Sequence, residues 1–169
     1  MKNRFNRKLS RPWAIFWWIL TVLWVGVLFF FSGQNGTDSG RLSDRLAAFL
    51  MSRFWFIQCG PGFLAYVLRK IAHFCIFALE GFLMRCAFYN TVPSHLPGML
   101  ATAALGGGLS VLNELHQLTS EGRACSPVDM LIDFSGAVTG MLAASLLCWI
   151  AESIHVRRQY LEITNTQKQ

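Results

Sequence analysis

The chain has 169 residues, of which 53% are hydrophobic and only 14% are charged. Soluble domains usually carry about 25% charged residues, so this composition, with a mean hydropathy of +0.39, excludes an ordinary soluble domain and indicates a membrane protein. The formal net charge of +6 is attributed to basic flanks that set topology and attract anionic lipid, and we expect no nucleic-acid partner.

The first predicted element is a membrane-spanning helix over residues 13–31, "WAIFWWILTVLWVGVLFFF", which contain no charged residue. Such a run is long enough to cross the roughly 30 Å hydrocarbon core of a bilayer. Basic residues precede it, as in a signal peptide, but the apolar part of a signal peptide spans only about 7–15 residues. No clear small-residue cleavage site follows Phe31. We therefore expect a retained membrane anchor.

An amphipathic helix is predicted in the loop that follows, in the stretch "SGRLSDRLAAFLMSRFWF" at residues 39–56. Its apolar residues at helical spacing are Leu42, Leu46, Phe49 and Leu50. Charged and polar residues lie largely on the other faces, and Ser39 is a candidate helix cap. This pattern is typical of a helix that lies in the membrane interface, and it equally allows a lid over the mouth of a helix bundle.

Three more spans are expected at about 68–88, 96–116 and 128–150, each apolar over most of its length. The fold class is therefore predicted to be all-α: a polytopic membrane protein with four transmembrane helices plus the interfacial helix, in a single domain over residues 1–150. Basic residues are expected on the cytoplasmic side, and they are dense before the first span. Both termini are thus expected in the cytoplasm, and residues 151–169 form a polar tail that we expect to fray.

Polar residues collect at the same end of all four predicted spans. The densest stretch is "NELHQLTSEGRACSPVDMLID" at 113–133, and polar residues also lie at 32–36 and at the start of the second span. Residues three or four apart share a helix face, which gives three polar stripes: Arg69, His73 and Glu80; Gly106, Ser110, Asn113 and Gln117; Asp129, Asp133, Gly136 and Gly140. Charged groups avoid lipid, and small residues let helices approach closely. We expect an outward-facing polar pocket above a seam of small residues.

The loop "TSEGRACSP" at 119–127 has the residues of a helix end followed by a helix start. Gly122 is predicted to end the third span. Ser126 is a candidate N-cap and Pro127 suits the first helical position. Asp129 then falls where a capping-box acid lies. Capping is therefore one explanation of Asp129, and a role in the pocket is the other.

Asp133 lies one helical turn deeper than Asp129, where an unpaired carboxylate is costly. Its candidate partners are Arg123 and the adjacent Arg69 and Lys70. These three side chains are therefore available partners for Asp133.

The chain resembles the VanZ-like family of small bacterial membrane proteins. The resemblance is carried by "FFFSGQ" at 29–34, "RKIAHF" at 69–74 and "NELHQLTSEGR…SPVDMLIDFSGAVTG" at 113–140, and it extends over about residues 13–150. It implies that the characteristic polar positions are Ser32, Gln34, Arg69, Lys70, His73, Glu114, Gln117, Arg123, Ser126, Asp129 and Asp133. It also implies a bacterial cell membrane and a link to resistance to the glycopeptide teicoplanin.

The sequence departs from that family pattern at three positions. Members often have an acid and then a tyrosine where this chain has Ile76 and Phe77, and often an acid at the position of Asn113. Glu80 lies one turn after Ile76 and is a candidate replacement for the missing carboxylate.

The predicted pocket suits an envelope component such as a phospholipid or a lipid-linked precursor, or a glycopeptide-related target. The ligand-binding candidates are Ser32, Gln34, Arg69, Lys70, Gln117, Arg123 and Ser126. The candidates for acid–base catalysis are His73, Glu114, Asp129 and Asp133. Buried carboxyl groups near one another can supply an acid and a base, so three interpretations stay open: a binding or structural network, a membrane-embedded enzyme, and transport.

No cofactor and no metal site is expected from the sequence. His73, Glu114, His116 and the two aspartates are possible ligands, but "NELHQ" lacks the H-E-x-x-H spacing of a zinc helix. His95 is expected to be solvated. The five cysteines form no metal pattern, and a disulfide between Cys59 and Cys125 stays open.

Overall fold

The computed structural model describes residues 10–166, which fold into helices connected by short loops and contain no strand. The helices are α1 (Arg11–Ser32), α2 (Gly36–Arg53), α3 (Pro61–Thr91), α4 (His95–Gln117) and α5 (Pro127–Thr166). Four of them, α1, α3, α4 and α5, are long and apolar enough to cross a membrane. The all-α, polytopic class expected from the sequence is confirmed, as is the helix in the first loop.

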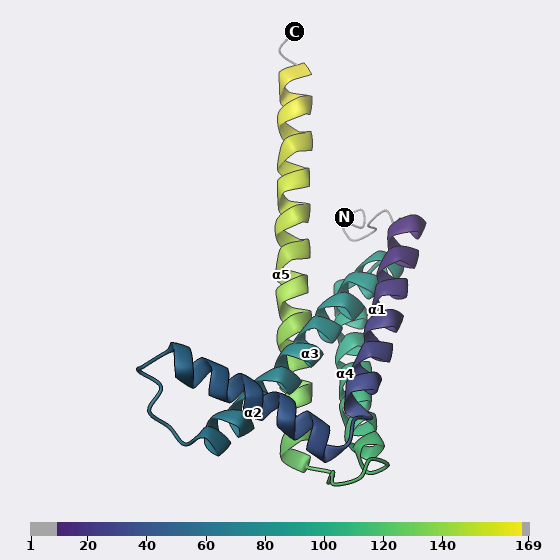
Figure 1. Ribbon diagram of the computed structural model, residues 1–169. Coiled ribbons are helices and arrows are strands. Elements are labelled where there is room, and N and C mark those ends of the chain that lie inside the picture. The colour runs from purple at the N-terminus through teal and green to yellow at the C-terminus, as the bar shows by residue number, and fades with distance from the viewer. Residues whose placement is uncertain (1–9, 167–169) are drawn as a thin grey trace.

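Helix α3 is the centre of the bundle, because it packs against each of the other four helices. Figure 1 shows α3 and α4 beside the first half of α5 and α1 on their far side, while α2 crosses the end of the bundle at a steep angle. The start of α1 and the end of α5 lie toward the opposite end (Figure 1). This arrangement brings the ends of four helices together next to α2.

Glycines make the contact between α3 and α5 very close. A Cβ atom at Gly140 would overlap the backbone of Ala78, and one at Gly136 would overlap the carbonyl of Phe74. In the other direction, a Cβ at Gly81 would overlap the backbone of Ala137. Gly136 and Gly140 therefore face another helix, which confirms the seam of small residues expected from their spacing.

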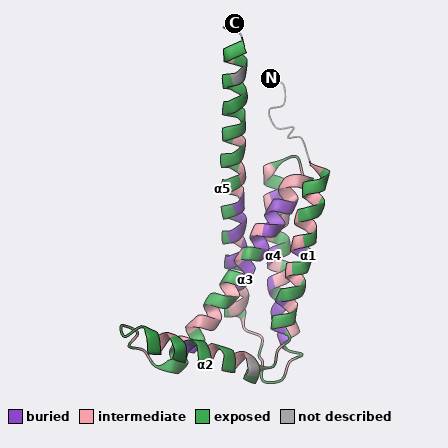
Figure 2. Cartoon of the chain, turned by 45° about the horizontal axis from the view of Figure 1, so that its top comes forward, coloured by how far each residue is buried: buried purple, intermediate pink, exposed green. Residues whose placement is uncertain are grey.

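The distribution of polarity is that of a membrane protein. Large apolar side chains of α1 are exposed, among them Val22, Leu23 and Phe30, whereas the interior holds charged and polar side chains. Figure 2 shows the buried residues where the helices meet, and mostly exposed residues on the upper half of α5. Lipid solvates the apolar exterior, so the polar groups are left to pair with one another inside.

Helix α2 begins at Gly36, so Ser39 lies inside its first turn and is not its cap, contrary to the expectation. The start is fixed by the loop between α4 and α5: the Gly36 N–H donates to the Glu121 carbonyl at 2.9 Å. A Cβ at Gly36 would lie 2.5 Å from the Gly122 carbonyl oxygen. Gly122 has a φ of +72°, so it turns this loop and does not end α4, which stops at Gln117.

The tail expected to fray is instead a continuation of α5, which is helical to Thr166. The physical reason is in the sequence, because no glycine or proline interrupts residues 141–166. Helix interiors tolerate most other residues at a cost below about 1 kcal/mol each.

Candidate functional site

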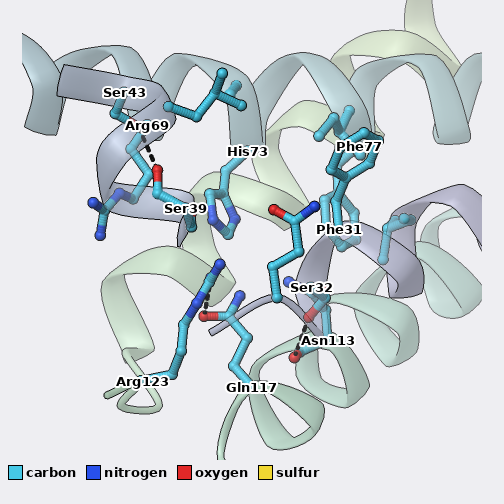
Figure 3. A pocket seen from close by; sticks show the side chains of 15 residues that line it. Phe31, Ser32, Ser39, Ser43, Arg69, His73, Phe77, Asn113, Gln117 and Arg123 are labelled. Atoms are coloured by element: carbon cyan, nitrogen blue, oxygen red, sulfur yellow. Dashed lines mark hydrogen bonds between the residues drawn. The ribbon is translucent and has the colours of Figure 1, made fainter. Parts of the chain in front are cut away.

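A cavity of about 220 Å³ lies between α2 and the adjacent ends of α1, α3 and α4. Its walls are formed by Leu28, Phe31, Ser32, Gln34, Ser39, Leu42, Ser43, Arg69, Ala72, His73, Ile76, Phe77, Asn113, Gln117 and Arg123. Figure 3 shows polar side chains from the loops and helix ends on one side and the Phe31 and Phe77 rings on the other. The cavity therefore has a polar end and an apolar end.

Most of the expected ligand-binding residues lie in this wall. Ser32, Gln34, Arg69, Gln117 and Arg123 line the cavity together with His73. Lys70 and Ser126 do not line it. Helix α2 contributes Ser39, Leu42 and Ser43, so it covers the cavity as a lid would, while its Leu46 and Phe49 are exposed.

Two arginines in the cavity wall have no acidic partner among the described residues. The buried Nε of Arg69 and the buried Nε of Arg123 both lack a hydrogen-bond acceptor. Arg123 Nη1 donates only to the amide oxygen of Gln117, at 3.1 Å. Burial lowers the pKa of Arg123, and the nearby charge of Arg69 lowers it further. Glu114 and Asp129 act on Arg123 from a distance and raise its pKa in part, but neither forms an ion pair with it. The two neighbouring guanidinium groups therefore form a site for an anion.

Asp133 is fully buried and does not line the cavity. The His73 Nδ1–H donates to Asp133 Oδ1 at 3.0 Å, and Asn113 Nδ2 donates to Oδ2 at 2.9 Å. Asp133 therefore pairs with His73 and Asn113 and with none of the available partners Arg123, Arg69 and Lys70. Helical spacing gave the correct face of α5, but the partner depends on which helix that face meets and at what depth.

Glu114 is also fully buried, and it is held by neutral donors. Gln117 Nε2 donates to its Oε1 at 3.0 Å, and the Ser126 backbone N–H donates to its Oε2 at 2.9 Å. The second bond ties the end of α4 to the start of α5. No cationic side chain of the described residues forms an ion pair with Glu114.

The start of α5 agrees in part with the N-cap expected from the sequence. Pro127 is the first helical residue, and the Asp129 N–H donates to Ser126 Oγ at 3.3 Å, as in an N-cap. The Asp129 carboxylate does not complete a capping box, because it forms an ion pair with Lys70. Glu114 accepts the Ser126 N–H in its place.

Donor atoms of His73, Glu114 and Asp133 all lie within 4.8 Å of one another. The three residues come from α3, α4 and α5, so the bundle fold alone brings them together. His116, also considered as a ligand, lies elsewhere: its ring packs edge-on against Phe29, with centroids 5.4 Å apart.

Glu80 does not replace the missing family acid in this cluster. It is fully buried, and neither carboxylate oxygen has a hydrogen-bond partner among the described residues. At the positions where family members often have an acid and a tyrosine, Ile76 and Phe77 form part of the apolar wall of the cavity.

A second polar network, far along α3 and α5 from the cavity, was not expected from the sequence. Arg85, fully buried, donates from Nε to Ser145 at 2.8 Å and from Nη2 to His95 Nδ1 at 3.2 Å. His95 Nε2 lies 3.2 Å from Glu152, which also accepts from the Tyr89 hydroxyl at 2.7 Å. His95 is therefore paired and not simply solvated. The feature of the sequence that could have predicted this network is Arg85, a charged residue in the middle of an apolar span.

Cys59 and Cys125, for which a disulfide was left open, are not joined by one in the structure.

Comparison with known proteins gives one match. The family model described as VanZ/LLP1 matches residues 17–149, which include all the cavity-lining residues and the buried acids Glu80, Glu114 and Asp133. No curated protein and no solved structure matches the chain. With a family model covering more than half of its length and four helices able to cross a membrane, the chain is a multi-pass membrane protein that belongs to the VanZ/LLP1 family.

Proposed function

We propose that the cavity binds the anionic headgroup of a cell-envelope lipid or lipid-linked precursor. The observation that carries this proposal is the pair of arginines, Arg69 and Arg123, which line the cavity without an acidic partner. Guanidinium groups bind phosphate and carboxylate through paired N–H donors. Both arginines are half-buried, and an anionic ligand would supply a counter-charge for their partly desolvated guanidinium groups.

The apolar end of the cavity supports a lipid ligand over a free anion. Leu28, Phe31, Ile76 and Phe77 line it, and they offer a surface for the first methylene groups of a chain. A volume of about 220 Å³ is below the roughly 300–1,000 Å³ of pockets that enclose drug-sized ligands. The headgroup would therefore lie inside while the chains remain in the bilayer.

We further propose that the cavity faces the outside of a bacterial cell and that both termini are cytoplasmic. The basic residues before α1 favour a cytoplasmic N-terminus, and four spans return the chain to the same side. An outward cavity is suited to envelope precursors, and protection against teicoplanin is the phenotype that such binding would produce.

The proposal is tested by lipid mass spectrometry on protein purified in mild detergent with EDTA present. We expect a specific anionic lipid to co-purify with the wild-type protein. Loss of a charge-assisted hydrogen bond costs about 1.5–3 kcal/mol, so Arg69→Gln and Arg123→Gln should each lower lipid retention about tenfold or more. Arg45→Gln, in which an exposed arginine of α2 is changed, is the matched control. Equal retention in all four proteins would contradict the proposal.

A second candidate function is catalysis on the bound component. The arrangement Asn113–Asp133–His73 favours it, because a carboxylate that orients a histidine beside a ligand cavity is the usual geometry of a general base. The test is turnover of a lipid-linked precursor by purified protein. Glu114 is the candidate acid whose carboxylate lies within 4.8 Å of the His73 and Asp133 donor atoms. Glu114→Gln should therefore fold and yet abolish both turnover and teicoplanin protection in a susceptible host. If the network were only structural, expression and thermal stability would fall together with the phenotype.

A further inference from the structure

The cluster of His73, Glu114 and Asp133 has the composition of a divalent cation site. One imidazole nitrogen and two carboxylate oxygens suit Zn²⁺ or Mn²⁺. Ligand bonds to such ions are about 2.0–2.2 Å long, so two ligands of one ion are at most about 4.4 Å apart. The three donor atoms already lie within 4.8 Å of one another, and a closure of a few tenths of an ångström would bring them into range.

The charges of the cluster also point to a cation. Glu114 and Asp133 are both fully buried, and a buried carboxylate is costly unless a counter-charge is near. Glu114 accepts only from an amide and a backbone N–H. Neither arginine of the cavity forms an ion pair with Glu114: Arg123 Nη1 donates to Gln117, and Arg123 acts on Glu114 only from beyond ion-pair distance. Two negative charges would be balanced by one divalent ion.

Neighbouring hydrogen-bond donors hold the carboxylates of the cluster in fixed orientations, as they do around metal ligands. Asn113 donates to one oxygen of Asp133, and Gln117 and the Ser126 N–H donate to the two oxygens of Glu114. Neutral donors of this kind hold ligating carboxylates in place and leave their second lone pairs available. His73 lines the cavity, so an ion has a route to the cluster from the cavity side.

We propose that His73, Glu114 and Asp133 bind one divalent transition-metal ion, of the Zn²⁺ or Mn²⁺ class, beside the anion-binding arginines. This replaces the expectation from the sequence that the chain holds no metal. The proposal does not rest on the lipid ligand, since ion binding is measured on protein purified without lipid. A bound ion also requires unprotonated ligand atoms, so an ion held by His73 would prevent that imidazole from acting as a general base.

The test uses protein purified in mild detergent with its affinity tag removed. The protein is dialysed against Zn²⁺ or Mn²⁺, then against metal-free buffer, and its metal content is measured by plasma mass spectrometry. We expect about one equivalent per chain. Asp133→Asn and Glu114→Gln preserve the shape of the site and should each weaken ion binding by about tenfold or more.

The matched control is Glu152→Gln, which removes the carboxylate of the His95–Glu152 pair outside the cluster and should leave ion binding unchanged. A second measurement covers the case in which the cluster variants do not fold. Electron paramagnetic resonance of Mn²⁺ on the wild-type protein should show coupling to an imidazole nitrogen. The proposal is overturned if the wild-type protein retains no ion, if that nitrogen coupling is absent, or if folded Asp133→Asn and Glu114→Gln bind as wild type.

Discussion

The close contact of α3 and α5 makes a strong prediction for the smallest possible substitution, Gly140→Ala. A single Cβ at this position would overlap the Ala78 carbonyl group, and backbone cannot move aside as a flexible side chain can. The two helices must separate, and overpacking of this kind costs about 1–3 kcal/mol. In a chain of this size 1 kcal/mol changes the melting temperature by about 2–4 °C, so we expect a decrease of about 2–12 °C.

The control is the same change at Gly26 of α1, which is exposed and has no atom within 4 Å of the position of a new Cβ. Alanine inside a helix is more favourable than glycine by about 0.5–1 kcal/mol, so Gly26→Ala should raise the melting temperature slightly. Both variants are melted in the same detergent with a thiol-reactive or intrinsic fluorescence readout. The reasoning is refuted if Gly140→Ala is as stable as Gly26→Ala. Gly136→Leu and the exposed Ala143→Leu should show the same contrast with larger amplitude.

Three further predictions concern topology and the two polar networks. In a background without native cysteines, Thr37→Cys should react with a membrane-impermeant thiol reagent added outside, and Asn165→Cys only with reagent added inside. Labelling of position 165 from outside would contradict the four-span topology. Lys70→Met should lower the free energy of unfolding by about 2–3 kcal/mol, because it leaves the carboxylate of Asp129 without its cation. The double variant Lys70→Met, Asp129→Leu should recover part of that loss in the same melting assay. Glu152→Gln should cost less than about 1 kcal/mol, since that side chain is 31% exposed, and a loss as large as that of Lys70→Met would refute this difference.

The spans and the location of the site could be predicted from the sequence. Apolar runs long enough to cross a bilayer gave the four helices, and helical periodicity placed His73, Asn113, Gln117 and Asp133 toward the interior, where the structure has them. The glycine spacing at 136–140 predicted which face of α5 meets another helix, and the structure confirms it. These features depend on one helix at a time, so a linear pattern is sufficient to specify them.

The pairings inside the site were decided only by the tertiary structure. The sequence offered three cations for Asp133, and the structure pairs it with His73 and Asn113. The sequence also indicated Asp129 as the acid that caps α5, whereas in the structure Glu114 of α4 accepts the Ser126 N–H. A hydrogen bond requires two atoms to come within about 3 Å, and that distance depends on helix crossing angles and close glycine contacts between separate helices. Periodicity along one helix specifies the direction of a side chain but not the helix that it meets or the depth at which it meets it.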